Sequence, residues 1–251
     1  MEPLRPEVRR SPPEVEERIR RMRLRIAVER VVREVSEDFG VPPPRVRVVE
    51  DEEVRSLCGT PLASACYRYQ EREIVIPESS AGIPLTVLHE FAHYLQHYRA
   101  GWDTEKAFPP EEYKKPAEER SFEREAYALA RALSGLYWDA LIKEVEGRPR
   151  EVRDKGLACA YASAKLASNM AEAALLSVEK RVGYARRELE EADALASVLP
   201  LLCPGADADR LEKVKLHIRD ALRSLEGDDY VGAQHSALLG TYSALETLRK
   251  R

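Results

Sequence analysis

The spacing of apolar positions in the first part of the chain predicts a helix followed by a strand. Over residues 13–39 apolar side chains recur at helical spacings, and the segment ends at Gly40. This periodicity is typical of an amphipathic helix. The prolines at 42–44 then exclude a helix, and the valine-rich stretch 46–49 favours a short strand.

Three further patterns complete the first half. Residues 65–76 alternate and then become apolar around a polar "QERE", which predicts a hairpin. Residues 84–101 begin with proline and end with glycine, as a helix does. A proline-rich loop at 102–118 is long enough to serve as a lid, and a strong 3.6-residue period resumes over 119–147.

The second half has a simpler pattern. Residues 147–156 concentrate charge, glycine and proline, and the chain beyond them is rich in alanine and leucine with helical periods. We therefore expect a frayed tail at 1–13, an α+β domain over 14–147 with a small sheet, and an all-α domain over 151–251 packed as a bundle or as hairpins. The protein should be mostly helical.

Composition narrows the function classes. The 251-residue chain has a net charge of −4, so nucleic acid is an unlikely partner. No apolar run is long enough for a membrane span, and the charged N-terminal stretch lacks the core of a secretory signal. We therefore expect a cytoplasmic protein that does not bind membranes. One asparagine, three glutamines and many charged residues are typical of a thermophile, a hypothesis about the source.

The four cysteines, at positions 58, 66, 159 and 203, show no CxxC pairing. This spacing argues against a zinc ribbon or a thioredoxin-like site. We expect buried free thiols.

The stretch "HEFAH" (89–93) contains the residues that point to a metal site. On a helix, His89 and His93 stand one turn apart, about 40° in azimuth and about 6 Å in rise, so their imidazoles can bind one ion. Glu90 is displaced by about 100°, which suits a general base acting on a water at the open position of the ion. Both histidines fall at the edge of an apolar stripe, as ligands on an anchored helix should.

The third ligand should come from the helix that follows the long loop. Glu123 lies at the edge of that helix's apolar stripe, and Glu119 and Glu125 are the alternatives. His97 stands about 12 Å from His89 along its helix, too far for a shared ion. We expect His97 to be a partly exposed structural residue, with a substrate-side role as the alternative.

These motifs resemble the ImmA/IrrE family of minimal gluzincin metallopeptidases. The similarity rests on "EIVIP" (73–77), "LTVLHEFAHYL" (85–95) and "FEREAYALARAL" (122–133), and extends over about residues 20–145. The resemblance implies a zincin-like fold, a zinc ion, a cytoplasmic role and cleavage of a regulatory protein. Tyr127 departs from the family, whose members often carry Asn or Asp there, which leaves a hydrogen bond to a zinc-binding histidine in question.

The expected activity is zinc-dependent hydrolysis of a protein or peptide substrate. Tyr127, His97, Tyr67 and Tyr69 are all candidates for the oxyanion donor. An extended substrate could add to the strand around Ile74 if that strand forms the sheet edge.

Two other function classes stay open. The chain could be a non-catalytic interaction or sensor protein that binds a partner, or a second copy, through its C-terminal helices. A weaker alternative is a HEPN-like ribonuclease using Arg210 and His217.

Overall fold

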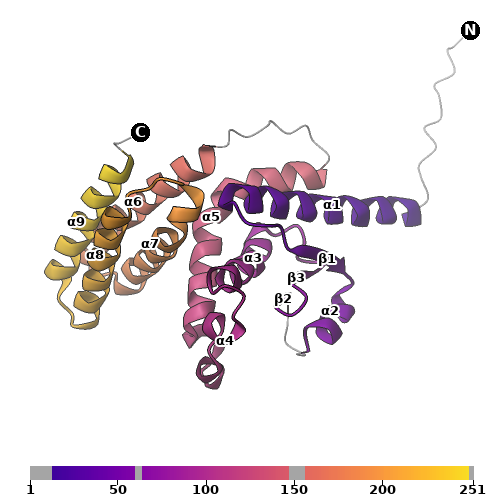
Figure 1. The fold of residues 1–251 in the computed structure, drawn as a ribbon, viewed down its shortest axis with the longest axis horizontal. Helices are drawn as coiled ribbons and strands as arrows, with labels where there is room; N and C mark the ends of the chain where they lie inside the picture. The colour runs from indigo at the N-terminus through magenta and orange to yellow at the C-terminus, as the bar shows by residue number, and fades with distance from the viewer. Residues whose placement is uncertain (1–12, 60–63, 147–155, 249–251) are drawn as a thin grey trace, which may run out of the picture.

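The fold is mostly helical, with a small sheet near the start of the chain, which confirms the prediction of a mostly helical protein with a small sheet (Figure 1). The computed structural model describes residues 13–59, 64–146 and 156–248. The first half contains α1 (Pro13–Phe39), β1 (Arg45–Val49), α2 (Asp51–Cys58), β2 (Cys66–Arg68), β3 (Glu73–Pro77), α3 (Pro84–Arg99), α4 (Thr104–Ala107), the 3₁₀ turns η1 (Pro110–Lys114) and η2 (Ala117–Glu119), and α5 (Ser121–Glu146).

The second half is all helical in its described part. It contains α6 (Leu157–Val178), α7 (Val182–Leu202), α8 (Ala208–Glu226) and α9 (Tyr230–Leu248). The predicted tail at 1–13 and the predicted boundary at 147–156 lie outside the described residues, except for Pro13 and Gly156.

The sheet has the order β1-β3-β2, with β1 parallel and β2 antiparallel to β3. The predicted hairpin is confirmed, because β2 and β3 pair directly. An extended substrate was expected on the strand around Ile74 only if that strand forms the sheet edge, and this condition is not met. Val46 of β1 pairs with Ile74 on one side and Tyr67 of β2 pairs with it on the other, so β3 is central and wholly buried, and β2 forms an edge.

Helix α2 is an element that the apolar pattern did not predict. It has acidic residues through its first turn, buries Val54 and ends at Gly59, whose φ of 69° is the left-handed conformation that glycine adopts readily. The acidic start and the glycine stop were both readable in the sequence, but eight residues offered little periodicity.

The expectation of free thiols is wrong, because all four cysteines form disulfides. Cys58 at the end of α2 is bonded to Cys66 of β2, and Cys159 of α6 is bonded to Cys203 after α7. Both partners of the first bridge are partly exposed, whereas Cys159 and Cys203 are buried. Pairing depends on proximity in the fold, about which the spacing along the chain carried no information.

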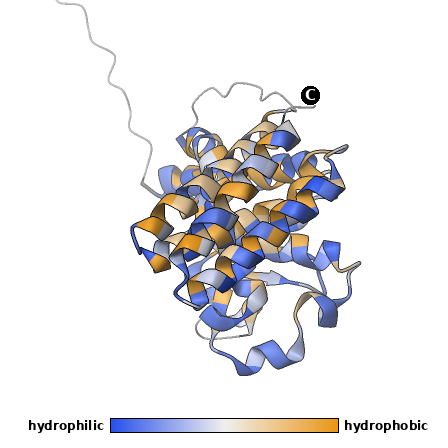
Figure 2. Ribbon diagram, turned by 90° about the vertical axis from the view of Figure 1, so that its left-hand side faces the viewer, coloured by the Kyte–Doolittle hydropathy of each residue, from blue (hydrophilic) through white to orange (hydrophobic). Residues whose placement is uncertain are grey.

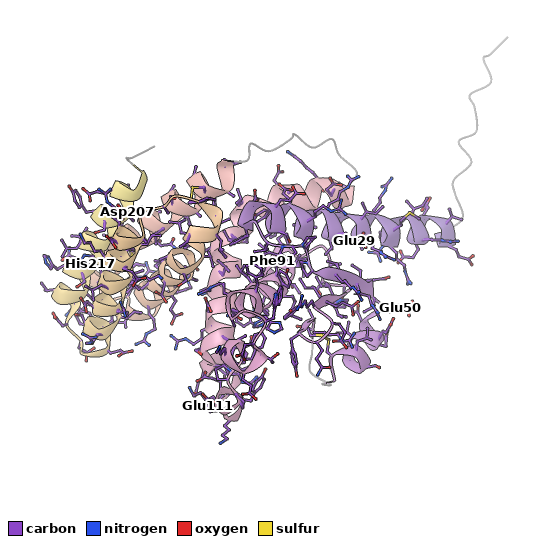
Figure 3. All side chains as sticks on the ribbon, in the orientation of Figure 1. Glu29, Glu50, Phe91, Glu111, Asp207 and His217 are labelled. Atoms are coloured by element: carbon purple, nitrogen blue, oxygen red, sulfur yellow. A yellow bond between two sulfur atoms is a disulfide. The ribbon has the colours of Figure 1, made fainter. Side chains whose placement is uncertain are left out.

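The hydrophobic core is continuous from α1 to α9. Phe91 of α3 packs against Phe39 of α1 in the interior (Figure 3). Helix α5 lies between α3 and α7 and so connects the sheet-containing half with the C-terminal helices (Figure 1). Those helices carry hydrophobic and hydrophilic sides (Figure 2). Within the described residues, no helix is both long and apolar enough to cross a membrane.

Candidate metal centre

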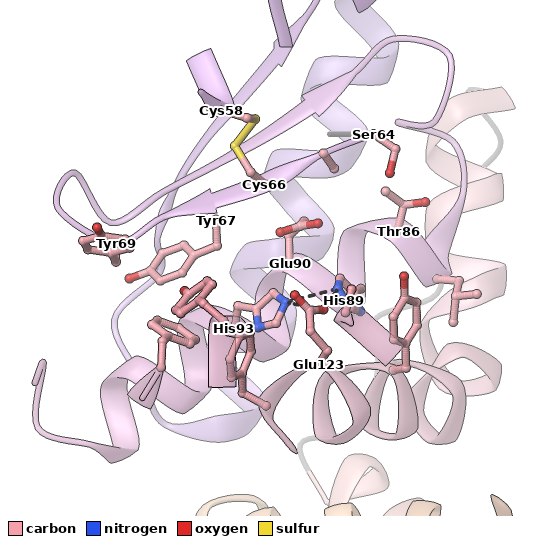
Figure 4. A pocket seen from close by; sticks show the side chains of 17 residues that line it. Cys58, Ser64, Cys66, Tyr67, Tyr69, Thr86, His89, Glu90, His93 and Glu123 are labelled. Atoms are coloured by element: carbon pink, nitrogen blue, oxygen red, sulfur yellow. Dashed lines mark hydrogen bonds and ion pairs between the residues drawn. A yellow bond between two sulfur atoms is a disulfide. The ribbon is translucent and has the colours of Figure 1, made fainter. Parts of the chain in front are cut away.

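Helix α3 presents the two histidines at the wall of a cavity. Pro84 stands in its first turn, and Leu88, Phe91 and Leu95 bury one side of the helix in the core. His89 and His93, one turn apart, project from the adjoining side toward the same point (Figure 4). This is the edge position that the helical pattern predicted.

Three ligand atoms converge there. His89 Nε2 lies 3.1 Å from His93 Nε2, and Glu123 Oε2 lies 3.3 Å from the former and 3.4 Å from the latter. Ligands about 2.0–2.1 Å from a tetrahedral zinc ion are separated by about 3.3–3.4 Å. The triangle therefore fits three corners of such a site, and among the described residues this group can hold a metal ion.

Helix α5 supplies the carboxylate from its first turn, and the two alternative ligands are elsewhere. Glu119 is exposed in η2. Glu125 forms an ion pair with Arg99 at 2.5 Å. The choice of Glu123 from the edge of the apolar stripe thus agrees with the geometry.

The electrostatics of the triad reflect mutual stabilisation. Burial opposes ionisation of Glu123, but hydrogen bonds with His89 and His93 outweigh it and hold its pKa well below the usual range. For His93, burial acts to lower the pKa, and the contact with Glu123 raises it overall. A carboxylate that stays ionised is ready to bind a cation.

Glu90 is buried beside the triad and is not part of it. Its side chain is aimed into the cavity next to the two histidines (Figure 4). Burial raises its pKa, while the neighbouring histidines oppose the rise. A carboxyl group that binds a proton more readily than usual suits proton transfer near neutral pH.

The cavity has a volume of about 450 Å³. One wall comes from β2 with Cys66 and Tyr67, and another comes from the segment after α3 with Phe108 and Tyr113. The segment predicted as a lid is thus folded into α4 and two 3₁₀ turns, and it lines the site through Phe108, Tyr113 and Ala117. Among the described lining residues, Glu90 and Glu123 are the only acidic or basic side chains besides the histidines.

His97 is buried, with 3% of its surface exposed, so the expectation of partial exposure is wrong. Its Nδ1 lies 2.9 Å from the hydroxyl oxygen of Tyr67, and Trp102 and Phe108 pack against its ring. Burial lowers the pKa of His97. The aromatic residues after α3 cover the position, which the pattern of α3 alone did not reveal.

The four candidate oxyanion donors differ in whether their polar atoms already have a hydrogen-bond partner and in how exposed they are. The hydroxyl of Tyr67 is engaged by His97. Tyr69 and Tyr127 line the cavity and are exposed, and the centroid of the Tyr127 ring lies 4.1 Å from that of the His89 ring. Tyr127 stands next to the triad.

The C-terminal pair considered for a ribonuclease has structural partners. Arg210 donates to the carbonyl oxygen of Glu246 at 2.6 Å and pairs with Asp207 at 3.2 Å. His217 lies seven positions further along α8, about 10 Å in rise, and packs near Gly240 of α9. His217 lies in α8 and Asp207 caps its start, both away from Phe91 of the motif helix (Figure 3).

Sequence reasoning did not single out Gln96, whose side chain contacts a histidine of the triad. Gln96 Oε1 lies 2.9 Å from His93 Nδ1. The available signal was its spacing, three positions after His93 on one helix.

Comparisons with protein-family models, with curated proteins and with solved structures find no match to this chain.

Proposed function

We propose that the protein is a zinc-dependent metallopeptidase of gluzincin type, with His89, His93 and Glu123 as ligands and Glu90 as general base. The observation that carries the proposal is the triangle of ligand atoms, with sides of 3.1–3.4 Å, facing a cavity that also holds a buried carboxyl group. Three protein ligands leave a fourth position open, as in catalytic rather than structural zinc sites.

A zinc ion bound there would polarise a substrate carbonyl and lower the pKa of a water molecule. Glu90 would accept the proton of that water and deliver it to the leaving amine. Its burial supports this role, because a raised pKa brings the carboxyl closer to the pKa values of its proton donors and acceptors. Tyr127 is the hydroxyl we place nearest the developing oxyanion, because its ring packs on His89 and lines the cavity.

Strand β2 is the edge on which an extended substrate would bind. It pairs with β3 on one side only, and its residues Cys66 and Tyr67 line the cavity. A peptide that adds to β2 would form main-chain hydrogen bonds while its scissile bond lies over the histidines. The resemblance to ImmA/IrrE proteins supports a regulatory protein in the cytoplasm as the substrate class.

The test is a comparison of Glu90→Gln with the wild-type protein on unstructured protein substrates. The variant should bind about one equivalent of zinc and lose about 10²–10⁴-fold in cleavage rate, because it keeps the ligands and loses the base. Equal cleavage by the two proteins would disprove the proposed mechanism. Tyr127→Phe should lower the rate and leave zinc content unchanged.

A second candidate function is a non-catalytic interaction or sensor protein that acts through the C-terminal helices. It is favoured by an apolar stripe on α9, where Val231, Leu238, Tyr242 and Leu245 are each 50% or more exposed. Stoichiometric zinc without Glu90-dependent cleavage would favour this candidate, and sedimentation analysis would show whether a second copy covers the stripe.

A further inference from the structure

We propose that Gln96 is a positioning residue that fixes the tautomer and the ring orientation of His93, and that Glu125 holds Gln96 in place. The inference rests on the proposed metal centre and adds to it the part of the chain that sets metal affinity. Gln96 lies one turn beyond His93 on α3 and is 7% exposed.

All the polar atoms of the Gln96 amide have partners. Its Oε1 lies 2.9 Å from His93 Nδ1. Its Nε2 donates to the carbonyl oxygen of Phe122 at 2.8 Å and to Glu125 Oε2 at 2.9 Å. A side chain on α3 is thus bonded to two successive points of α5, on either side of the ligand Glu123.

These partners permit only one orientation of the amide. A carbonyl oxygen and a carboxylate oxygen can only accept, so the NH₂ group must face them. Reversing the amide would place Oε1 against two acceptors and lose both hydrogen bonds. Oε1 therefore faces His93, and the hydrogen of that ring must lie on Nδ1.

The consequence for His93 is a defined ligand. When a metal ion replaces the hydrogen that His93 Nε2 shares with Glu123, the ring keeps its hydrogen on Nδ1, and the lone pair of Nε2 is directed at the point where His89 and Glu123 converge. The hydrogen bond also limits rotation of the ring. The bond to the Phe122 carbonyl anchors the backbone next to Glu123, so one amide aligns two ligands from two helices.

Glu125 is itself fixed, because Arg99 pairs with its other oxygen at 2.5 Å. The series Arg99, Glu125, Gln96, His93 runs from the partly exposed surface to the ligand. A histidine ligand whose second nitrogen donates to a fixed acceptor binds metal more tightly, and loss of such a partner costs about 10–100-fold in affinity.

The other histidine ligand lacks this support. His89 Nδ1 is buried and has no hydrogen-bond partner among the described residues, and its ring is held by packing against Tyr127. The site is therefore asymmetric. Its hydrogen-bonded support is concentrated on His93, so Gln96 should control metal affinity.

The experiment measures zinc affinity of the full chain by competition with a chelating dye. Gln96→Met keeps the length of the side chain and removes its hydrogen bonds, and we expect about 10–100-fold weaker binding. Gln70→Met makes the same chemical change at an exposed turn and should leave the affinity unchanged. Glu125→Met should cost about fivefold, one hydrogen bond, whereas Glu125→Gln keeps one oxygen that can accept from Gln96 Nε2 and should bind zinc more tightly than Glu125→Met.

A second measurement separates positioning from a general effect on folding. In ¹⁵N-histidine NMR of the zinc-loaded protein, His93 should show a slowly exchanging Nδ1 proton that Gln70→Met retains and Gln96→Met loses. Wild-type affinity and an unchanged Nδ1 proton in Gln96→Met would overturn the inference while the metal centre stands. If Gln96→Met does not fold, equal zinc affinity of Glu125→Met and Glu125→Gln would overturn it. Failure of the wild-type chain to bind zinc would instead overturn the metal centre itself.

Discussion

If the triad binds zinc as we propose, replacing Glu123 with glutamine should reduce the thermal stabilisation that added zinc produces. The carboxylate oxygen forms two of the three sides of the ligand triangle, at 3.3 and 3.4 Å, so its loss leaves only the histidine pair. Glutamine has the same shape and carries no charge. Because losing a hydrogen-bond partner of a ligand already costs about 10–100-fold in affinity, loss of the ligand charge itself should cost at least about 100-fold.

The expected change in melting temperature follows from mass action. Zinc at a free concentration about 1,000 times the wild-type Kd stabilises the folded state by about 4.1 kcal/mol. At the same concentration, a variant with about 100-fold weaker affinity gains about 1.4 kcal/mol. The difference of about 2.7 kcal/mol corresponds to about 5–11 °C in Tm for a chain of this size.

The assay is differential scanning calorimetry with zinc and with a chelator, so that any effect of the substitution on the metal-free protein cancels. Glu119→Gln is the matched control, because Glu119 is exposed in η2 and outside the triangle. A Glu123→Gln protein that keeps the full zinc-dependent rise in Tm, or a Glu119→Gln protein that loses it, would refute the assignment of the third ligand.

Three other predictions concern the rest of the molecule. Loop entropy predicts that removing the Cys159–Cys203 bridge, with a sequence separation of 44, costs about 4 kcal/mol of stability. Removing Cys58–Cys66, with a separation of 8, should cost about 2.5 kcal/mol. Denaturant unfolding of variants in which both cysteines of one bridge are replaced by serine tests this order. A low-molecular-weight dithiol should reduce Cys58–Cys66 first because that bridge is partly exposed, and alkylation with mass mapping would reveal the reverse. Burial, followed by the charge of Glu191, raises the pKa of Glu188 above its unfolded value, so this carboxyl lowers stability as pH rises through its folded pKa. Glu188→Gln should therefore increase the free energy of unfolding at about pH 8 and have little effect at about pH 4; an equal effect at both would contradict the reasoning.

The parts of the site that lie on single helices were predictable from the sequence. On α3, a 3.6-residue period fixed both the buried side, with Phe91, and the azimuth of His89 and His93. On α5, the same reasoning ranked Glu123 above two neighbouring glutamates. The directions inferred for these side chains agree with the structure because a helix converts sequence spacing into direction without reference to the rest of the fold.

The parts that depend on contacts between elements were not predictable in this way. Parallel pairing with β1 made β3 the central strand, and no property of residues 73–77 alone required it. The burial of His97 is produced by Trp102 and Phe108, which return over α3 from the following segment. The role of Gln96 required the position of the Phe122 carbonyl on another helix.

Helix α5 makes the C-terminal half part of the scaffold of the candidate metal centre. Arg124 and Arg131 of α5 form ion pairs with Glu190 and Glu191 of α7, and Ala128, between them on the same face, is buried. The position of the Glu123 carboxylate relative to α3 therefore depends on α5, and contacts with α7 stabilise the position of α5. A chain shortened to its first half would expose that face of α5, so any metal binding measured on such a fragment would not represent the intact protein.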